Sequence, residues 1–318
     1  MLERPTLGVI MDPIDTIHPE KDSTLALLIE AQKRDFALYY MELPDLFLQY
    51  GLAWSYCRSL DVSTDPKNWY SLSKPAALPL DQFDVLLMRK DPPVNMEYIY
   101  ATYILEHAEQ NGVLVINKPQ SLRDANEKLF TTWFPQCMPP TLVTSSKQAL
   151  KAFVEEHRCA VLKPLDGMGG QRIFKCEITD PNLTVIIESL TNNGLHYIMA
   201  QRFIPEITEG DKRILLIEGD PLPYGLARIP APHEFRGNLA AGGHGIGSPL
   251  TERDLWICAQ IGPTLREKGL LFAGIDVIGE YLTEINITSP TCIKELEKAF
   301  EVDIAGEVLD CICEKLNK

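Results

Sequence analysis

The sequence predicts an α/β fold at the N-terminus, followed by α+β modules. Two observations lead to this prediction. Over the first third of the chain, short apolar runs alternate with helix-like segments, which is typical of a parallel sheet with crossover helices. After Asn117-Lys118-Pro119 the apolar runs become shorter and are often joined as hairpins, for example around Gly219, which is typical of α+β modules.

In the first third, a helix is predicted over 23–33, with Asp22 or Ser23 as its N-cap, and a second helix over 96–110. The stretch 61–81 is rich in Pro, Ser, Asp and Lys and is predicted to be a surface excursion. The predicted strands of this region are 6–11, 37–41, 85–88 and 113–116.

In the rest of the chain, the apolar runs predict the strands 159–163, 172–176, 197–204, 213–218 and 222–228. A long segment rich in glycine and proline follows, over 229–249. A loop of that length inside a compact domain is usually functional, so a lid is predicted there.

The composition limits the classes of function. The chain has 318 residues, which is enough for two or three domains, and a formal net charge of -14. An acidic chain is poorly suited to nucleic acid, which is bound by an excess of Lys and Arg. The N-terminus has no secretion signal, and no run of eighteen apolar residues exists, so the cytoplasm is the expected compartment with no membrane partner. The eight cysteines and six histidines have no metal-site spacing.

A glycine-rich turn follows directly on a predicted strand that ends at Lys163. Gly167, Gly169 and Gly170 would let backbone N–H groups approach phosphate oxygens without obstruction by side chains. The turn is neither a Walker A loop nor a dinucleotide-binding fingerprint. A plain hairpin turn is the alternative, but the lysine at the strand end favours phosphate binding.

Asp276, Glu284 and Asn286 lie on two apolar strands around Gly279-Glu280. Their hard oxygen atoms suit Mg²⁺. A regular two-residue hairpin would pair Asp276 with Thr283 and turn Glu284 to the opposite face. A three-residue turn or a bulge pairs Asp276 with Glu284 and collects the apolar residues on the other face, so we predict one of these. A solvent-exposed polar face is the alternative to a metal site.

Several cations stand at positions that are unusual for surface charge. Arg228 ends an apolar strand, and Arg236 lies inside the glycine-rich segment. Lys128 is predicted to lie on a helix that begins near Ser121. Two cations and a carboxylate, Arg89, Lys90 and Asp91, come just after a strand, where open α/β sheets bind ligands. Each of these could equally be a solvated charge, but arginine is suited to a bidentate grip on phosphate or carboxylate.

The ordered set of these motifs resembles the ATP-grasp signature, and over nearly the whole chain the sequence is similar to the bacterial glutathione synthetases. The segments that carry this resemblance are 88–93, 117–124, 163–170, 236–243 and 282–286. The resemblance implies an N-terminal α/β domain over 1–124, a small ATP-grasp lobe over 125–203, and a C-terminal lobe over 204–318 with a lid at 229–244. ATP would lie between the two lobes.

The resemblance also implies roles for individual residues. The residues expected to bind ATP are Lys128, Lys163, Gly167, Met168, Gly169, Gly170, Gln201, Phe203, Ile204 and Asp211. Arg213, Arg228 and Arg236 are the expected catalytic residues. Asp276, Glu284 and Asn286 are expected to hold Mg²⁺, with Mn²⁺ as an alternative. Arg89, Asn286 and Ser289 are expected to contact the substrate.

The implied reaction joins γ-glutamylcysteine to glycine with cleavage of ATP, through an acyl phosphate, in a homotetramer. Two alternatives remain open at this point. The chain could be another ATP-grasp acid–amine ligase, such as a D-alanine–D-alanine ligase. It could also be an ATP-binding regulatory protein that performs no chemistry.

Overall fold

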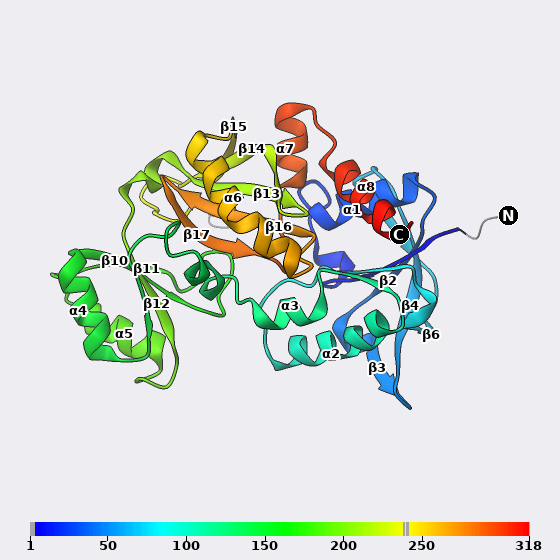
Figure 1. Cartoon of the computed structure of the whole chain (residues 1–318), viewed down its shortest axis with the longest axis horizontal. Helices are drawn as coiled ribbons and strands as arrows, with labels where there is room; N and C mark the ends of the chain where they lie inside the picture. The colour runs from blue at the N-terminus through cyan, green and yellow to red at the C-terminus, as the bar shows by residue number, and fades with distance from the viewer. Residues whose placement is uncertain (1–3, 238, 240–241, 318) are drawn as a thin grey trace.

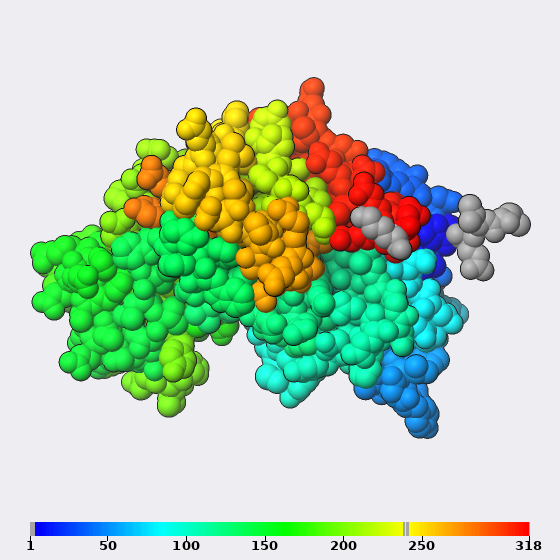
Figure 2. Space-filling model, viewed as in Figure 1, coloured from blue at the N-terminus to red at the C-terminus, as the bar shows by residue number. Residues whose placement is uncertain are grey.

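The computed structural model describes residues 4–237, 239 and 242–317, and the strands of this part of the chain form three sheets. The sheet with the strands β9 to β12 forms a lobe at one end of the molecule, and the sheet with β1 to β8 lies at the other end (Figure 1). The third sheet, with β13 to β17, lies between them. The space-filling view shows the small lobe projecting from the rest of the molecule (Figure 2).

The N-terminal sheet has the order β3-β4-β2-β1-β7-β8, and β2, β1, β7 and β8 are parallel. The helix α1 begins where predicted, because Asp22 Oδ1 accepts a hydrogen bond from Leu25 N at 2.6 Å. The predicted bounds of α1, β2, β7 and α2 agree with the structure. The elements are β1 (Thr6–Ile10), α1 (Ser23–Lys33), β2 (Ala37–Met41), β7 (Val85–Met88), α2 (Met96–Gln110), β8 (Leu114–Ile116) and α3 (Pro119–Asp124).

The same sheet also contains four strands that the sequence analysis missed. The stretch 61–81 is not a simple surface excursion, because two of these strands lie in it and both pair antiparallel with β4. The β4 strand alternates exposed and buried residues, but its buried positions include Ala53 and Ser55, which hide the alternation. The missed strands are β3 (Leu46–Gln49), β4 (Leu52–Val62), β5 (Tyr70–Leu72) and β6 (Ala76–Pro79).

The small lobe is an antiparallel sheet of the order β11-β10-β12-β9. Two helices pack on it, and Leu162, Ile187 and Ile198 are among the buried residues of its own apolar core. Lys163 lies near the end of β10, as predicted, and the glycine-rich turn follows this strand. The elements are β9 (Thr141–Thr144), α4 (Lys147–His157), β10 (Cys159–Pro164), β11 (Phe174–Glu177), α5 (Leu183–Thr191) and β12 (Ile198–Arg202).

The third sheet is antiparallel and has the order β15-β14-β13-β16-β17. At the β13–β14 hairpin, Gly219 has a φ of +76°, and a Cβ there would lie 2.3 Å from the carbonyl oxygen of Gly262 in α6, so the crossing requires glycine. The elements are β13 (Asp211–Ile217), β14 (Asp220–Ile229), β15 (His244–Pro249), α6 (Glu252–Glu267), β16 (Phe272–Ile278), β17 (Tyr281–Asn286), α7 (Ile293–Phe300) and α8 (Ile304–Leu316).

The predicted register of the last hairpin is confirmed. Ile278 pairs with Tyr281 across Gly279-Glu280, and the pairing then shifts by one residue, so that Asp276 faces Glu284. A β-bulge next to a two-residue turn produces this shift. The shift keeps Ile275 and Ile285 on the buried face while the acidic residues share the other face.

The structure shortens the glycine-rich segment that was predicted as a loop over 229–249. Since β14 runs to Ile229 and β15 begins at His244, the connection between these two strands is nearly the predicted lid of 229–244. Residues 238, 240 and 241 of the lid lie outside the described residues, as do residues 1–3 and 318 at the outer limits of the predicted domains. Within the described ranges, no helix has both the length and the apolar character needed to cross a membrane.

Candidate active site

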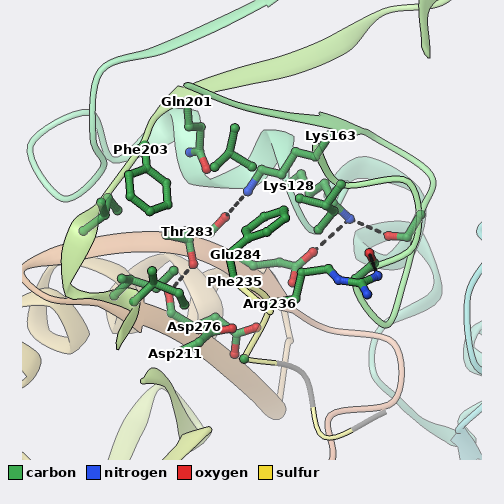
Figure 3. Close-up of a pocket in the computed structure, with 18 of the residues that line it drawn as sticks. Lys128, Lys163, Gln201, Phe203, Asp211, Phe235, Arg236, Asp276, Thr283 and Glu284 are labelled. Carbon is green, nitrogen blue, oxygen red and sulfur yellow. Dashed lines mark hydrogen bonds and ion pairs between the residues drawn. The ribbon is translucent and has the colours of Figure 1, made fainter. Parts of the chain in front are cut away.

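A cleft of about 810 Å³ lies between the small lobe and the third sheet, and we call it the nucleotide cleft (Figure 3). Backbone and side chains of β10, β12, β13, β16 and β17 line it, together with the glycine-rich turn. All of the residues predicted to bind ATP lie along this cleft, from Lys128 and the glycine-rich turn to Gln201, Phe203 and Asp211.

Each of the two lysines of the nucleotide cleft contacts β17 of the third sheet. Lys163 is buried, and its Nζ donates to the carbonyl oxygen of Thr283 in β17 at 3.1 Å. Burial lowers the pKa of Lys163 to about 8. Lys128 Nζ donates to the carbonyl oxygen of Gly167 at 2.5 Å and lies 2.9 Å from Glu284 Oε1. Two cations therefore lie near the start of the glycine-rich turn, side by side in Figure 3.

The predicted helical position of Lys128 is wrong. The helix α3 ends at Asp124, and Lys128 lies after it, as the N-cap of a short 3₁₀ helix over Leu129–Trp133. Asn126 Oδ1 accepts from the backbone N–H groups of Lys128 and Leu129 at 3.1 and 3.0 Å, which ends one helical segment and begins the next. This break places the lysine against the glycine-rich turn.

Four charged side chains form a buried cluster between two pockets: two aspartates line the nucleotide cleft, and two arginines line a second pocket beside it. Arg213 Nε and Nη2 donate to the two carboxylate oxygens of Asp276 at 2.5 and 3.1 Å. Arg228 Nη2 lies 2.9 Å from Asp276 Oδ2 and 2.6 Å from Asp211 Oδ2. Burial alone would raise the pKa of Asp276, but the two guanidinium groups outweigh it and hold this pKa below its ordinary value. Asp276 is therefore a stable anion.

Asp211 differs from Asp276 in its surroundings. Its Oδ1 atom is buried and has no hydrogen-bond partner in the part of the chain that the structure describes. Burial raises the pKa of Asp211, although Arg228 acts in the opposite direction. Asp211 lies at the wall of the nucleotide cleft, and Gly237 passes close to it, since a Cβ on Gly237 would lie 2.8 Å from Asp211 Cβ.

Asp276, Glu284 and Asn286 share one face of the β16–β17 hairpin, as predicted. Asn286 Nδ2 donates to Asp276 Oδ2 at 3.3 Å, which leaves its side-chain oxygen free of that contact. Among the described residues no group of three or more His, Cys, Asp or Glu side chains could hold a metal ion. The third donor here is an amide, however, and carboxylate and amide oxygens are the ligands that fit Mg²⁺. The residues present therefore fit a divalent cation.

The segment after β14 reaches across the glycine-rich turn. Arg236 Nη1 donates to the carbonyl oxygen of Gly170 at 2.9 Å, and Arg236 Nη2 lies 2.5 Å from Glu234 Oε2. The hydrogen bond from Arg236 holds the pKa of Glu234 below its ordinary value. Arg236 and Phe235 thereby close one side of the nucleotide cleft (Figure 3).

A second pocket of about 780 Å³ adjoins the first, and we call it the acceptor pocket. The two share Met168, Gly169 and Glu284. Of the residues predicted for catalysis, metal or substrate, the acceptor pocket is lined by Arg213, Arg228, Glu284, Asn286 and Ser289.

Arg89 lines neither of these two pockets, contrary to its predicted contact with the substrate. Its guanidinium is buried between α1 and the loop after β17. Nε donates to Thr24 Oγ1 at 3.0 Å and Nη2 donates to the carbonyl oxygen of Pro290 at 2.9 Å. The arginine supports the wall of the acceptor pocket from behind.

Comparison with known proteins decides the family. Residues 6–123 match the N-terminal domain of prokaryotic glutathione synthetase, and residues 127–301 match its ATP-grasp domain. The chain belongs to the prokaryotic glutathione synthetase family. As a member of this family it is an ATP-dependent carboxylate–amine ligase.

Curated relatives in the glutathione synthetase family match over nearly their full length. The glutathione synthetase of Vibrio cholerae is 56% identical over 98% of both chains, and that of Pseudomonas putida is 57% identical over 98% of both. The enzyme of Escherichia coli O157:H7 is 56% identical over 98% of this chain and 99% of its own.

Solved structures show the fold of the glutathione synthetase family in distant proteins. The D-cycloserine synthetase DcsG superposes with a TM-score of 0.70 at 13% identity and covers 98% of this chain and 99% of its own. D-alanyl-alanine synthetase A from Vibrio cholerae has a TM-score of 0.62 at 14% identity, with full coverage of both chains. Since these identities are low, the D-alanine–D-alanine ligase alternative is supported by the fold alone.

The sequence analysis missed much of the acceptor pocket of this glutathione synthetase family member. Glu127 precedes the predicted Lys128, and its Oε1 accepts from the backbone N–H groups of Ile287 and Thr288 at 2.9 and 3.1 Å. A carboxylate beside a predicted ligand was the signal that could have identified it. The missed lining residues are Glu127, Leu239, Thr288, Thr291 and Cys292, whereas Asp91 and Pro92 belong to the segment after a strand that the sequence analysis singled out.

Proposed function

We propose that the chain joins the cysteinyl carboxylate of γ-glutamylcysteine to the amino group of glycine, with ATP converted to ADP and phosphate through an acyl phosphate. One observation carries this proposal. The nucleotide cleft and the acceptor pocket meet at Gly169 and Glu284, so a phosphoryl group at this junction would lie within reach of a carboxylate in the acceptor pocket.

In the first step, the triphosphate of ATP would lie along the glycine-rich turn between Lys128 and Lys163. The substrate carboxylate would approach from the side of Arg213 and Arg228. Two anions must meet here, and buried cations that are already in place stabilise the charge that develops during phosphoryl transfer. The backbone of 201–204 would contact the adenine and Asp211 the ribose, and these residues line the nucleotide cleft.

Asp276, Glu284 and Asn286 would hold the divalent cation, which we propose to be Mg²⁺ with Mn²⁺ as an alternative. This ion would neutralise charge on the triphosphate and on the transferring phosphoryl group. A distant relative in fold, the ATP-grasp ligase PsnB, was solved with its minimal precursor, Mg and ADP, and it superposes with a TM-score of 0.63 at 15% identity. Asp276 would exchange part of its contact with the arginines for the ion.

In the second step, the amine of glycine would attack the carbonyl of the acyl phosphate and release phosphate. Water competes with the amine for this intermediate, so the site must be covered. Arg236 already joins the segment after β14 to Gly170, and we propose that 229–244 is the cover. No protein nucleophile is required, and none of the eight cysteines has a part in this proposal.

The experiment mixes purified protein with ATP, Mg²⁺, γ-glutamylcysteine and glycine and follows ADP and glutathione together. Equal amounts of both products, formed only with both amino substrates, support the proposal. Hydroxylamine in place of glycine should trap the acyl phosphate as a hydroxamate. Binding of ATP without turnover would favour the regulatory alternative, and ADP release only with other acid–amine pairs would change the substrate.

Three further features remain proposals. They are the domain limits at 124 and 203, the assembly as a homotetramer and the localisation to the cytoplasm. The first is tested by limited proteolysis, the second by the mass of the purified protein in solution, and the third by fractionation of cells.

A further inference from the structure

Asp91 presents a carboxylate to the acceptor pocket from the N-terminal domain. It lies just after β7, at the edge of the sheet formed by the carboxyl ends of the parallel strands, which is where open α/β sheets bind ligands. The remaining walls of the pocket come from Glu127, the glycine-rich turn, the two arginines of β13 and β14, Leu239, β17 and the loop after it. Asp91 therefore brings a carboxylate of the N-terminal domain into a pocket whose other walls come mostly from the ATP-grasp lobes.

The carboxylate of Asp91 is fixed in position. Ser289 Oγ donates to Asp91 Oδ1, and the backbone N–H of Asp91 donates to Asp12 Oδ2 at 2.9 Å. The neighbouring cation, Lys90, is turned toward Asp12, with Nζ 2.7 Å from Oδ1. Over the described ranges, no side chain or backbone group donates to Asp91 Oδ2. One oxygen of a held carboxylate is left for a ligand.

The other two carboxylates of the acceptor pocket have partners within the ATP-grasp lobes. Glu284 pairs with Lys128 at 2.9 Å, at the junction with the nucleotide cleft. Glu127 Oε1 receives three hydrogen bonds from Ile287 and Thr288. Burial and the nearby Glu284 raise the pKa of Glu127, which makes it a weaker counter-charge. Asp91 is the carboxylate best suited to an incoming cation.

The loop that carries Ser289 is held from behind by Arg89. Because Arg89 Nη2 donates to the carbonyl oxygen of Pro290 at 2.9 Å, the residue next to Ser289 is tied to the N-terminal domain. Ser289 and Asp91 are thus brought together by two connections between the same two segments. The guanidinium itself is buried, lines neither pocket, and donates its hydrogen bonds to Thr24 and Pro290.

The dipeptide γ-glutamylcysteine has a single cationic group, the α-ammonium of the glutamyl residue, at the end opposite to the reacting carboxylate. From Glu284, at the nucleotide junction, to Ser289 the chain advances by five residues, which is at most about 17 Å, and the γ-linked dipeptide is about as long as three residues, or roughly 10 Å. A substrate whose carboxylate lies at the junction is therefore long enough to extend its ammonium group toward Ser289 and Asp91, which line the same pocket.

We infer that Asp91, positioned by Ser289, binds the α-ammonium group of the γ-glutamyl residue and selects acyl substrates that carry it. This inference rests on the proposed function. It assigns to the N-terminal domain the recognition of the glutamyl end, while the ATP-grasp lobes activate the carboxylate at the other end.

The test compares γ-glutamylcysteine with glutarylcysteine, which lacks only the amino group. For the wild type, kcat/KM should be about 10- to 100-fold higher with γ-glutamylcysteine, as expected for a hydrogen bond between charged groups. In Asp91→Asn, kcat/KM with γ-glutamylcysteine should fall by about that factor, and the value with glutarylcysteine should change little. The KM for ATP should stay constant. Glu97→Gln, which removes an exposed charge from the same domain, is the matched control.

Ser289→Ala should reduce the preference for γ-glutamylcysteine in the same direction by a smaller factor, because Asp91 keeps its charge and loses only its orientation. An equal fall of Asp91→Asn on both substrates would overturn the inference in favour of a purely structural role. Loss of the preference in Glu127→Gln but not in Asp91→Asn would assign the ammonium group to Glu127 instead. A wild type that turns over neither substrate would contradict the proposed function itself.

Discussion

The nucleotide cleft and the acceptor pocket meet at Glu284, but they are assembled in different ways. Much of the nucleotide cleft comes from short runs of neighbouring residues, 167–171, 201–204 and 235–237. The acceptor pocket takes Asp91 from one domain, Glu127 from the connection between domains, and Thr291 and Cys292 from a loop near the C-terminus. A sequence motif can specify the first kind of site and not the second.

Lys163 and the buried charge cluster between the two pockets also differ in how their charges are compensated. Lys163 is buried against a neutral carbonyl oxygen, and its lowered pKa of about 8 reports that burial disfavours its charge. Asp276 has two guanidinium partners and a pKa below its ordinary value. Within the described part of the chain, Lys163 thus has no anionic partner in an ion pair and can serve a ligand, whereas the charges of Asp276, Arg213 and Arg228 compensate one another. The predictions below use this difference.

The largest combined effect is expected for Asp276→Asn. It removes a ligand of the proposed metal and should lower turnover about 100- to 1,000-fold. It also leaves Arg213 and Arg228 without their shared counter-charge, so the free energy of unfolding should fall by about 3–5 kcal/mol. ADP release and chemical unfolding of the same preparation measure both. An active, fully stable variant would show that the buried charge cluster does not depend on this carboxylate.

Lys163→Met sharpens the comparison, because activity and stability should change in opposite directions. Turnover should fall about 100-fold or more, since a cation at the phosphates is lost. Without ATP, the free energy of unfolding should rise by about 1–3 kcal/mol, because a buried ammonium group is replaced by an apolar side chain of similar length. Loss of stability together with retained turnover would contradict the assignment of Lys163 to the phosphates.

Arg89→Met should affect the acceptor pocket alone. The loop at Pro290 loses its tie to the N-terminal domain, so the KM for γ-glutamylcysteine should rise about 10-fold, while the KM for ATP stays within a factor of two. Steady-state kinetics with each substrate varied in turn measure this. Arg266→Met is the control, because its guanidinium binds the carbonyl oxygen of Glu218 at 2.8 Å, away from both pockets. Equal rises in both KM values would indicate a general loss of structure.

The smallest effect is a pH dependence of the nucleotide cleft. Lys163 is protonated below about pH 8 and loses its charge as the pH rises through that value, so the KM for ATP should increase a few-fold over the next pH unit. Lys163→Arg should remove this increase, because a guanidinium stays protonated.

The stability of the unliganded protein should follow the opposite trend. Between about pH 8 and the ordinary pKa of 10.5, the unfolded chain binds the proton that Lys163 has lost in the folded state, so Lys163 contributes an increase of stability with pH in that window. The difference in unfolding free energy between wild type and Lys163→Met measures this contribution. A KM for ATP that is flat above pH 8 in the wild type would show that Lys163 keeps its proton at the site.

Prediction from sequence succeeded where the physical signal is local. Asp22 caps α1 because a short carboxylate reaches the N–H groups of the first turn, and the sequence shows both. Asp276 faces Glu284 because only that register buries the apolar residues of both strands. The strand β4 was missed because its pairing with β2, β3, β5 and β6 supplies the stability that its residues do not reveal.

The sequence by itself therefore determined the family and the glycine-rich turn after Lys163, since both are recorded in motifs of neighbouring residues. The tertiary structure alone decided that Arg89 supports a wall and that Asp91 faces the acceptor pocket. These two side chains follow one strand only two positions apart, and their partners Pro290 and Ser289 are about two hundred residues away. No local pattern shows which of two nearby polar side chains will be buried by a distant segment and which will face a pocket.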